Sequence, residues 1–227
     1  MKLKLLPIIL IALLISCGNR ASSKKEEKEY VKYTVNFEQF DLGSKKMYQS
    51  QETGFDETLL AYFNQATDNL TTSFTATKNN RVKIEESDFV ENYQNVKGLI
   101  IGSSSNDGQI DLSFSKKLHT VSIEIEQYYN IYYGYDFGSK KVQIRYDCQE
   151  YDETLEEYVG YSTITVNDSR WKGTGETYLY NEDYTEMIIE VPNRNTAFFE
   201  INDTELKLEG LESERCRIYS MTLEFEK

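Results

Sequence analysis

Apolar and polar residues alternate along most of the chain, with a repeat of two residues rather than three or four. A repeat of two is typical of strands that bury one face, because successive side chains point to opposite sides. The clearest runs are Val31, Tyr33, Val35 and Phe37; Ile110, Leu112 and Phe114; Val121, Ile123 and Ile125; Val142, Ile144, Tyr146 and Cys148; Phe199 and Ile201; Leu206 and Leu208; and Met221, Leu223 and Phe225. Polar turn sequences such as residues 78–80, 103–108, 138–141, 167–169 and 193–195 separate them. Many short strands without intervening helices predict an all-β fold, an antiparallel β-sandwich.

One segment departs from this alternation. Residues 56–66 carry Leu59, Leu60, Phe63 and Ala66 at helical spacing, which predicts one short N-terminal helix with an apolar face. We expect this helix to cover an end of the sandwich. The alternative is an irregular connection whose leucines fill a gap.

The first residues carry the three parts of a secretory signal. Lys2 and Lys4 give a basic start, residues 5–15 form an apolar stretch, and the small residue Ser16 follows it. The apolar stretch is shorter than the roughly 20 residues that a membrane-spanning helix needs. The alternatives are a short transmembrane anchor or a signal that is cut at another position.

The end of this signal, LISC at residues 14–17, resembles the lipobox of bacterial lipoproteins. The resemblance implies that residues 1–16 are a signal peptide, that the chain is cut before Cys17, and that the sulfur of Cys17 carries a lipid. Two or three acyl chains would anchor the protein stably in a cell membrane, facing outside the cytoplasm.

The polar stretch of residues 18–29 contains no residues that form a core, so residues 17–29 are predicted to be the lipidated cysteine and a disordered tether. Residues 30–227 then form the β-sandwich domain. Six of the 25 basic residues and three of the 38 acidic ones precede Tyr30, which leaves 19 basic and 35 acidic residues and a net charge of −16. Such a surface repels phosphate backbones, which argues against nucleic acid as a partner.

The central part of the chain resembles the β-jelly-roll modules, similar to carbohydrate-binding modules, of secreted nucleases and surface lipoproteins of low-GC bacteria. The resemblance spans roughly residues 74–225 and rests on a succession of short strings: GLIIGSSS at 98–105, GQIDLSFS at 108–115, LHTVSI at 118–123, STITVN at 162–167, MIIEV at 187–191 and RIYSMTL at 217–223. It implies that the sandwich is a jelly roll, and a binding role for it.

An aromatic run at residues 128–137 is the first candidate binding site. The candidate ligand-binding residues are Tyr128, Tyr132, Tyr133 and Tyr135, together with Trp171 in a polar loop. Flat aromatic rings pack against the apolar face of a sugar, while hydroxyl groups satisfy its polar edge. The alternative is an ordinary strand that buries every second tyrosine in the core.

Two acidic clusters suggest a structural calcium ion. Ca²⁺ takes six to eight oxygen ligands, and carboxylates gather at Asp147, Glu150, Asp152 and Glu153, and again at Glu182, Asp183 and Glu186. Neither cluster has the spacing of a recognised calcium loop, and the alternative is a solvated charged face. We expect no other cofactor.

The sequence offers few candidate catalytic residues. The single histidine, His119, precedes the run that begins at Val121, where we expect a half-exposed turn residue, and no nucleophile motif accompanies it. A hydrolase that uses two carboxylates stays open as a minor alternative.

Two cysteines lie in the predicted domain, Cys148 and Cys216. Outside the cytoplasm they are able to form a disulfide, which on the chain-entropy estimate would stabilise the fold by roughly 4 kcal/mol. The alternative is a pair of buried thiols.

Together these patterns predict a lipid-anchored extracytoplasmic protein that is not an enzyme and that binds carbohydrate or another surface ligand. The alternative is a surface adhesion or structural protein that contacts other proteins through sheet edges or loops.

Overall fold

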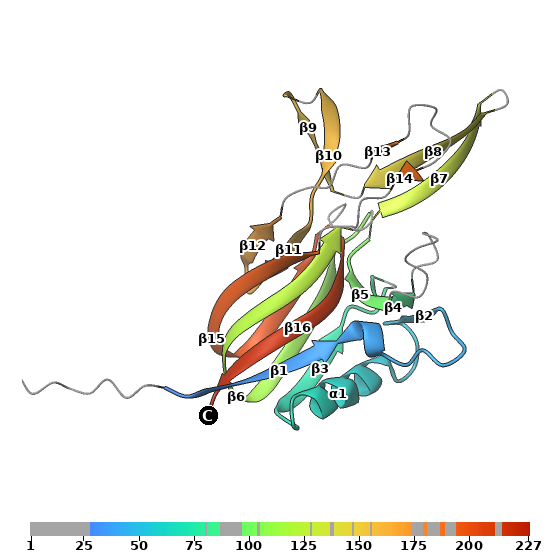
Figure 1. The fold of residues 1–227 in the computed structure, drawn as a ribbon. Helices are drawn as coiled ribbons and strands as arrows, with labels where there is room; N and C mark the ends of the chain where they lie inside the picture. Colours follow the sequence, from blue (N-terminus) through green and yellow to red (C-terminus); the bar gives the residue numbers. More distant parts are fainter. Residues whose placement is uncertain are drawn as a thin grey trace, which may run out of the picture.

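The computed structural model describes residues 28–79, 81–86, 97–103, 105–127, 129–136, 139–146, 148–154, 156–173, 179–180, 187–188, 194–211 and 215–227 (Figure 1). The helices are the 3₁₀ turn η1 (Phe37–Gln39) and α1 (Phe55–Ala66). The strands are β1 (Tyr30–Asn36), β2 (Met47–Gln49), β3 (Thr71–Ala76), β4 (Val82–Glu86), β5 (Lys97–Ile101), β6 (Gly108–Gln127), β7 (Tyr129–Asp136), β8 (Ser139–Tyr146), β9 (Gln149–Asp152), β10 (Glu157–Gly160), β11 (Thr163–Val166), β12 (Ser169–Lys172), β13 (Leu179–Tyr180), β14 (Met187–Ile188), β15 (Asn195–Gly210) and β16 (Cys216–Glu226).

Ten of these strands form one curled antiparallel sheet. Its main path runs β12-β11-β15-β6-β16-β5-β4-β2, while β1 pairs with β16 and β3 pairs with β6. The long strands curve around one side of the core, and α1 lies beside β1 and β3 (Figure 1). This confirms the prediction of an all-β antiparallel sandwich with one short N-terminal helix. The more specific resemblance to carbohydrate-binding jelly rolls stays a prediction.

The alternating pattern explains how β16 fills the core. Met221, Leu223 and Phe225 are fully buried, and Met221 and Leu223 stand opposite Ile123 and Val121 of β6. The register shifts between Ile218 and Ser220, so that one extra residue, Tyr219, interrupts the alternation.

Two pairs of runs that the sequence separates are single strands in the structure. The apolar runs of residues 110–114 and 121–125 both belong to β6, and those of residues 199–201 and 206–208 both belong to β15. Register shifts between Glu200 and Glu205 let β15 bend without ending. His119 consequently lies inside β6, half-buried, and not in the expected turn.

Helix α1 is confirmed, and it begins one residue before the predicted range. Phe55, Leu59 and Phe63 recur at a spacing of four residues and are buried. The ring of Phe63 lies 5.6 Å from that of Phe74, between ring centroids, which packs the helix against β3. Gly54 precedes the helix with a positive φ of 81°, a conformation that glycine adopts without steric cost.

Three glycines let β5, β6 and β15 approach closely near the end of β5. A side chain at Gly210 would place its Cβ 2.2 Å from the carbonyl oxygen of Ile101, and one at Gly108 would lie 2.3 Å from the nitrogen of Gly102. Gly102 itself has a φ of +88°. These positions therefore require glycine.

The pairs β7–β8, β9–β10 and β13–β14 form three small two-stranded sheets outside the main one. They lie at the end of the molecule opposite the start of β1, and the C-terminus lies close to that start (Figure 1). Residues 1–27, including Cys17, lie outside the described part of the chain.

Candidate functional site

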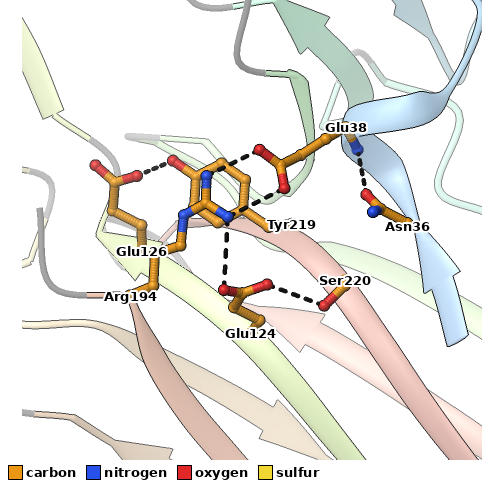
Figure 2. Close-up of polar contacts among 7 residues, drawn as sticks. All are labelled: Asn36, Glu38, Glu124, Glu126, Arg194, Tyr219 and Ser220. Atoms are coloured by element: carbon orange, nitrogen blue, oxygen red, sulfur yellow. Dashed lines mark hydrogen bonds and ion pairs between the residues drawn. The ribbon is translucent and has the colours of Figure 1, made fainter. Parts of the chain in front are cut away.

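Charged side chains and the ring of Tyr219 surround Arg194 where η1, β6 and β16 meet (Figure 2). We call Glu38, Glu124, Glu126, Arg194 and Tyr219 the Arg194 cluster. It joins η1, β6, β16 and the start of β15, at the end of the sheet from which the chain continues into β7.

The guanidinium of Arg194 holds the cluster together. It donates two hydrogen bonds to Glu38, from Nη2 to Oε1 at 2.8 Å and from Nη1 to Oε2 at 3.0 Å. A longer contact of 3.5 Å joins Nη1 to Glu124. The guanidinium carbon also lies 3.8 Å from the centre of the Tyr219 ring, within the range of a cation–π contact. Two-point pairing and stacking both use the planar geometry that distinguishes arginine from lysine.

Glu126 is the most unusual member of the cluster because its carboxyl group is almost fully buried. It is 2 % exposed, and the hydroxyl group of Tyr219 donates a hydrogen bond to its Oε2. Burial raises the pKa of Glu126 to about 7, although the positive charges of Arg217 and Arg194 oppose this shift. Near neutral pH this side chain therefore exists both protonated and ionised.

The local sequence explains why these groups meet. Glu124 and Glu126 are two residues apart in β6, so they share the face opposite Ile123 and Ile125. The irregularity of β16 turns Tyr219 and Ser220 toward that face, and the hydroxyl of Ser220 donates to Glu124 at 3.1 Å. The side chain of Asn36 accepts the backbone N–H of Glu38 at 3.0 Å, which fixes the start of η1 (Figure 2).

No pattern in the sequence predicts this cluster. Its members are single polar residues of otherwise ordinary strands, and Arg194 belongs to a sequence that predicts only a turn. Chemically, the cluster is able to exchange one proton near neutral pH. We call the end of the molecule that carries β7–β8, β9–β10 and β13–β14 the hairpin end. The charged groups of the cluster pair with one another, which suits a role in fixing the base of the hairpin end rather than in attacking a substrate.

Three of the four predicted tyrosines lie in the β7–β8 hairpin. Tyr132, Tyr133 and Tyr135 belong to β7, where their backbones pair with Gln143, Val142 and Lys140 of β8. Tyr133 and Tyr135 occupy alternate positions, and Tyr132 has the opposite parity. Tyr128 lies outside the described residues. The backbone trace thus brings the three described tyrosines to one hairpin at the end away from β1 (Figure 1).

Trp171 lies in β12, opposite Ile164 of β11. Its side chain is half-buried and packs against the hydrophobic core, and its ring leaves no space for a side chain at Gly173. Two tyrosines lie on segments that contact Lys172, the neighbour of Trp171 in β12. Tyr151 in β9 is 53 % exposed, and Glu150 beside it pairs with Lys172. The ring centre of the half-buried Tyr161, which follows β10, lies 4.0 Å from the ammonium group of Lys172. A ligand platform at Trp171 stays a prediction, and the structure gives the residue a packing role in addition.

Two acidic residues of the calcium hypothesis, Glu150 and Asp152, contact other groups in the described part of the chain. Glu150 forms an ion pair with Lys172, and Asp152 accepts the backbone N–H of Thr154 at 2.8 Å within a turn. Asp147, Glu182, Asp183 and Glu186 lie outside the described residues. Among the described side chains, no group of three or more His, Cys, Asp or Glu residues is arranged to hold a metal ion.

His119 lies far from the Arg194 cluster along β6, near the C-terminal end of β16. Its Nδ1 is 2.9 Å from the Oδ1 of Asn202, and its ring stacks on Tyr30 with 4.4 Å between the ring centroids.

Cys148 and Cys216 are both buried free thiols, the second of the two alternatives for this pair. Cys216 belongs to the main hydrophobic core, and burial raises its thiol pKa to about 12. The sulfur of Cys148 lies 3.9 Å from the carbonyl oxygen of Arg215.

Comparisons of the chain with protein-family models, with curated proteins and with solved structures find no match. Within the residues that the structure describes, α1 included, no helix has the length and apolar character needed to cross a membrane.

Proposed function

We propose that this chain is a lipid-anchored, extracytoplasmic binding protein that recognises carbohydrate or another surface ligand through its hairpin end. One observation carries the proposal. The predicted tether joins the start of β1, whereas the tyrosine-bearing β7–β8 hairpin lies at the opposite end of the sheet (Figure 1). A protein held at a membrane by Cys17 would present that hairpin away from the lipid.

The composition of the hairpin end supports a role in binding. The sequence of β7 contains tyrosines, and the rings of Tyr151 in β9, of Tyr161 after β10 and of Trp171 in the nearby main-sheet strand β12 are flat aromatic surfaces. Such surfaces suit the apolar faces of sugars, and their hydroxyl groups suit polar edges. The net charge of −16 from Tyr30 onward favours neutral or basic ligands over anionic ones.

The Arg194 cluster supports the same role structurally. It ties the end of β6, which leads into β7, to η1 and to the start of β15. A binding element that is held by a rigid base loses less entropy when it binds its ligand.

Metabolic labelling with a fatty acid tests the anchor. We expect the full chain to incorporate the label and Cys17→Ala to lose it. The control is Cys148→Ala, which leaves the lipobox intact and should keep the label. Equal labelling of wild type and Cys17→Ala would refute lipidation at Cys17.

Binding of the fragment of residues 28–227 to glycan arrays and cell-wall polysaccharides tests the ligand. This fragment contains every described helix and strand. We expect a bound glycan whose affinity falls at least tenfold in Tyr132→Ala or Tyr133→Ala, which lie at positions of opposite parity in β7. The control is Phe198→Ala, which removes a ring that is 55 % exposed on the main sheet. A folded fragment that binds no glycan would contradict carbohydrate recognition.

A further inference from the structure

A groove separates β1 from helix α1, well away from the hairpin end. Its volume is about 620 Å³. One wall is formed by Thr34 and Asn36 of β1, the opposite wall by Ala61, Tyr62 and Ala66 of α1, and Asp41 lies at the rim that follows η1. Alanines leave room between the walls, and Asp41 is the one charged residue among the described residues of the lining.

The wall formed by β1 is an open strand edge. β1 pairs with β16 along its whole length, from Tyr30↔Glu226 to Asn36↔Ser220, and no other described strand pairs with it. The N–H of Lys227 donates to the carbonyl of Glu29 at 3.0 Å, which makes Glu29 and Lys227 a hydrogen-bonded pair.

Because hydrogen-bonded and non-bonded pairs alternate in an antiparallel ladder, the odd-numbered residues of β1 bond to β16. The even-numbered residues, among them Lys32, Thr34 and Asn36, direct their N–H and C=O groups to the open side. The hydroxyl of Tyr62 in α1 donates to the carbonyl of Asn36. This contact agrees with the register, which directs the carbonyl of Asn36 to the open side of β1. The backbone of Thr34 therefore faces the groove.

Open edges in soluble proteins are commonly protected by charged side chains, lysine in particular. Lys32 lies at the edge outside the groove, where it forms an ion pair with Glu224. Thr34 and Asn36, which border the groove, carry no charge. The edge of β1 therefore lacks charged side chains at Thr34 and Asn36, where α1 forms the second wall of the groove.

We propose that this groove, the β1–α1 groove, binds an extended segment of a partner protein that adds as a strand to the edge of β1. Backbone groups of such a segment would pair with Thr34, and its side chains would alternate between the groove and solvent, as in other cases of strand addition. The segment would carry small or hydroxyl side chains and a Lys or Arg opposite Asp41, which forms no ion pair with a described residue.

Charge favours this occupant over a second copy of the chain. Pairing of two β1 edges would bring together two domains that each carry a net charge of −16. A basic segment of another protein meets an attractive field instead. The inference is independent of the ligand proposed for the hairpin end.

Selection of a displayed library of nine-residue peptides on the full chain in detergent tests the proposal. We expect enriched peptides that contain Lys or Arg, and that lose binding when alternate amides are N-methylated. Thr34→Pro removes an edge N–H but no backbone bond to β16, and proline is tolerated at such edge positions. It also removes the exposed hydroxyl contact of 3.2 Å between Thr34 and Thr222, so Thr34→Val, which loses that contact but keeps the N–H, is its control. We expect Thr34→Pro to weaken binding of a selected peptide at least tenfold.

A second pair of variants keeps the test decisive if Thr34→Pro does not fold. Ala61 is exposed in α1, and Ala61→Tyr would fill the groove and should also weaken peptide binding at least tenfold. The control Glu57→Tyr adds the same side chain to an exposed position of α1 outside the groove, and should change the affinity less than twofold. Asp41→Asn should lower the affinity for basic peptides about threefold.

Three results would overturn the proposal. The first is the absence of any enriched peptide. The second is a selected peptide that binds Ala61→Tyr as tightly as wild type. The third is a concentration-dependent dimer that Ala61→Tyr dissociates, because the occupant of the groove would then be a second copy.

Discussion

Replacing Glu126 by glutamine should remove a pH dependence of stability that this one buried carboxyl group creates. Glutamine keeps nearly the same shape, and its amide oxygen accepts the hydroxyl of Tyr219 as the carboxyl group does. The difference is that Glu126 ionises within the folded protein, where it is 2 % exposed, whereas glutamine stays neutral. An ionised carboxylate loses more hydration on burial than a neutral group does.

The size of the effect follows from the pKa of Glu126, which burial raises from 4.5 to about 7. Between these two values the folded protein holds a proton that the unfolded chain has released, so stability falls as the pH rises. Each pH unit in this window lowers the free energy of unfolding by up to about 1.36 kcal/mol. The contribution is therefore fully present below pH 4.5 and is lost as the pH passes about 7, a total of about 3 kcal/mol.

Urea unfolding of residues 28–227 between pH 5 and pH 8, followed by the fluorescence of the single tryptophan, measures this difference. We expect the stability of Glu126→Gln relative to wild type to increase by about 2 to 3 kcal/mol between pH 5 and pH 8. The control is Glu124→Gln, which removes a neighbouring, part-exposed carboxylate and should follow the wild-type profile. A constant difference between Glu126→Gln and wild type across this pH range would refute the reasoning.

Three further changes test other parts of the structure. Arg194→Lys should lower the free energy of unfolding by about 1 kcal/mol in urea melts, because lysine loses the two-point pairing and the stacking on Tyr219. Gly210→Ala should lower it by at least about 2 kcal/mol, since the new Cβ would meet the backbone of β5; an unchanged melting temperature would contradict this. Titration of the fragment with a thiol reagent should count two thiols, Cys148 and Cys216, in denaturant and none within minutes in the native state, whereas a count of zero in denaturant would indicate a disulfide.

The local pattern of the sequence predicts the elements well where burial alternates without interruption. Met221, Leu223 and Phe225 point into the core as their spacing indicates, and Phe63 does so in α1. The pattern does not show that two runs form one strand. β15 bends between Glu200 and Glu205, where the polar residues 202–204 separate the two apolar runs. The register shift there preserves the inward face on both sides.

The Arg194 cluster could not be predicted because its contacts are long-range. Arg194 and Glu38 are 156 positions apart, and they meet only once β6, β15 and β16 are paired in the correct register. The open edge of β1 escaped prediction for the same reason. The sequence shows an alternating run at residues 31–37, but not that β16 is the strand with which it pairs in the described part of the chain.

Arg194 joins the two surfaces for which we propose ligands. Asn36 borders the β1–α1 groove and fixes the start of η1, where Glu38 pairs with Arg194. On its other side Arg194 stacks on Tyr219, which donates to Glu126 at the base of the hairpin end. A continuous set of contacts does not by itself couple two sites, since coupling needs a group with two states that both sites influence. Arg194 has a single arrangement in this structure, paired with Glu38 and stacked on Tyr219. The Arg194 cluster is therefore a structural link between the groove and the hairpin end, and its contacts alone do not couple ligand binding at the two surfaces.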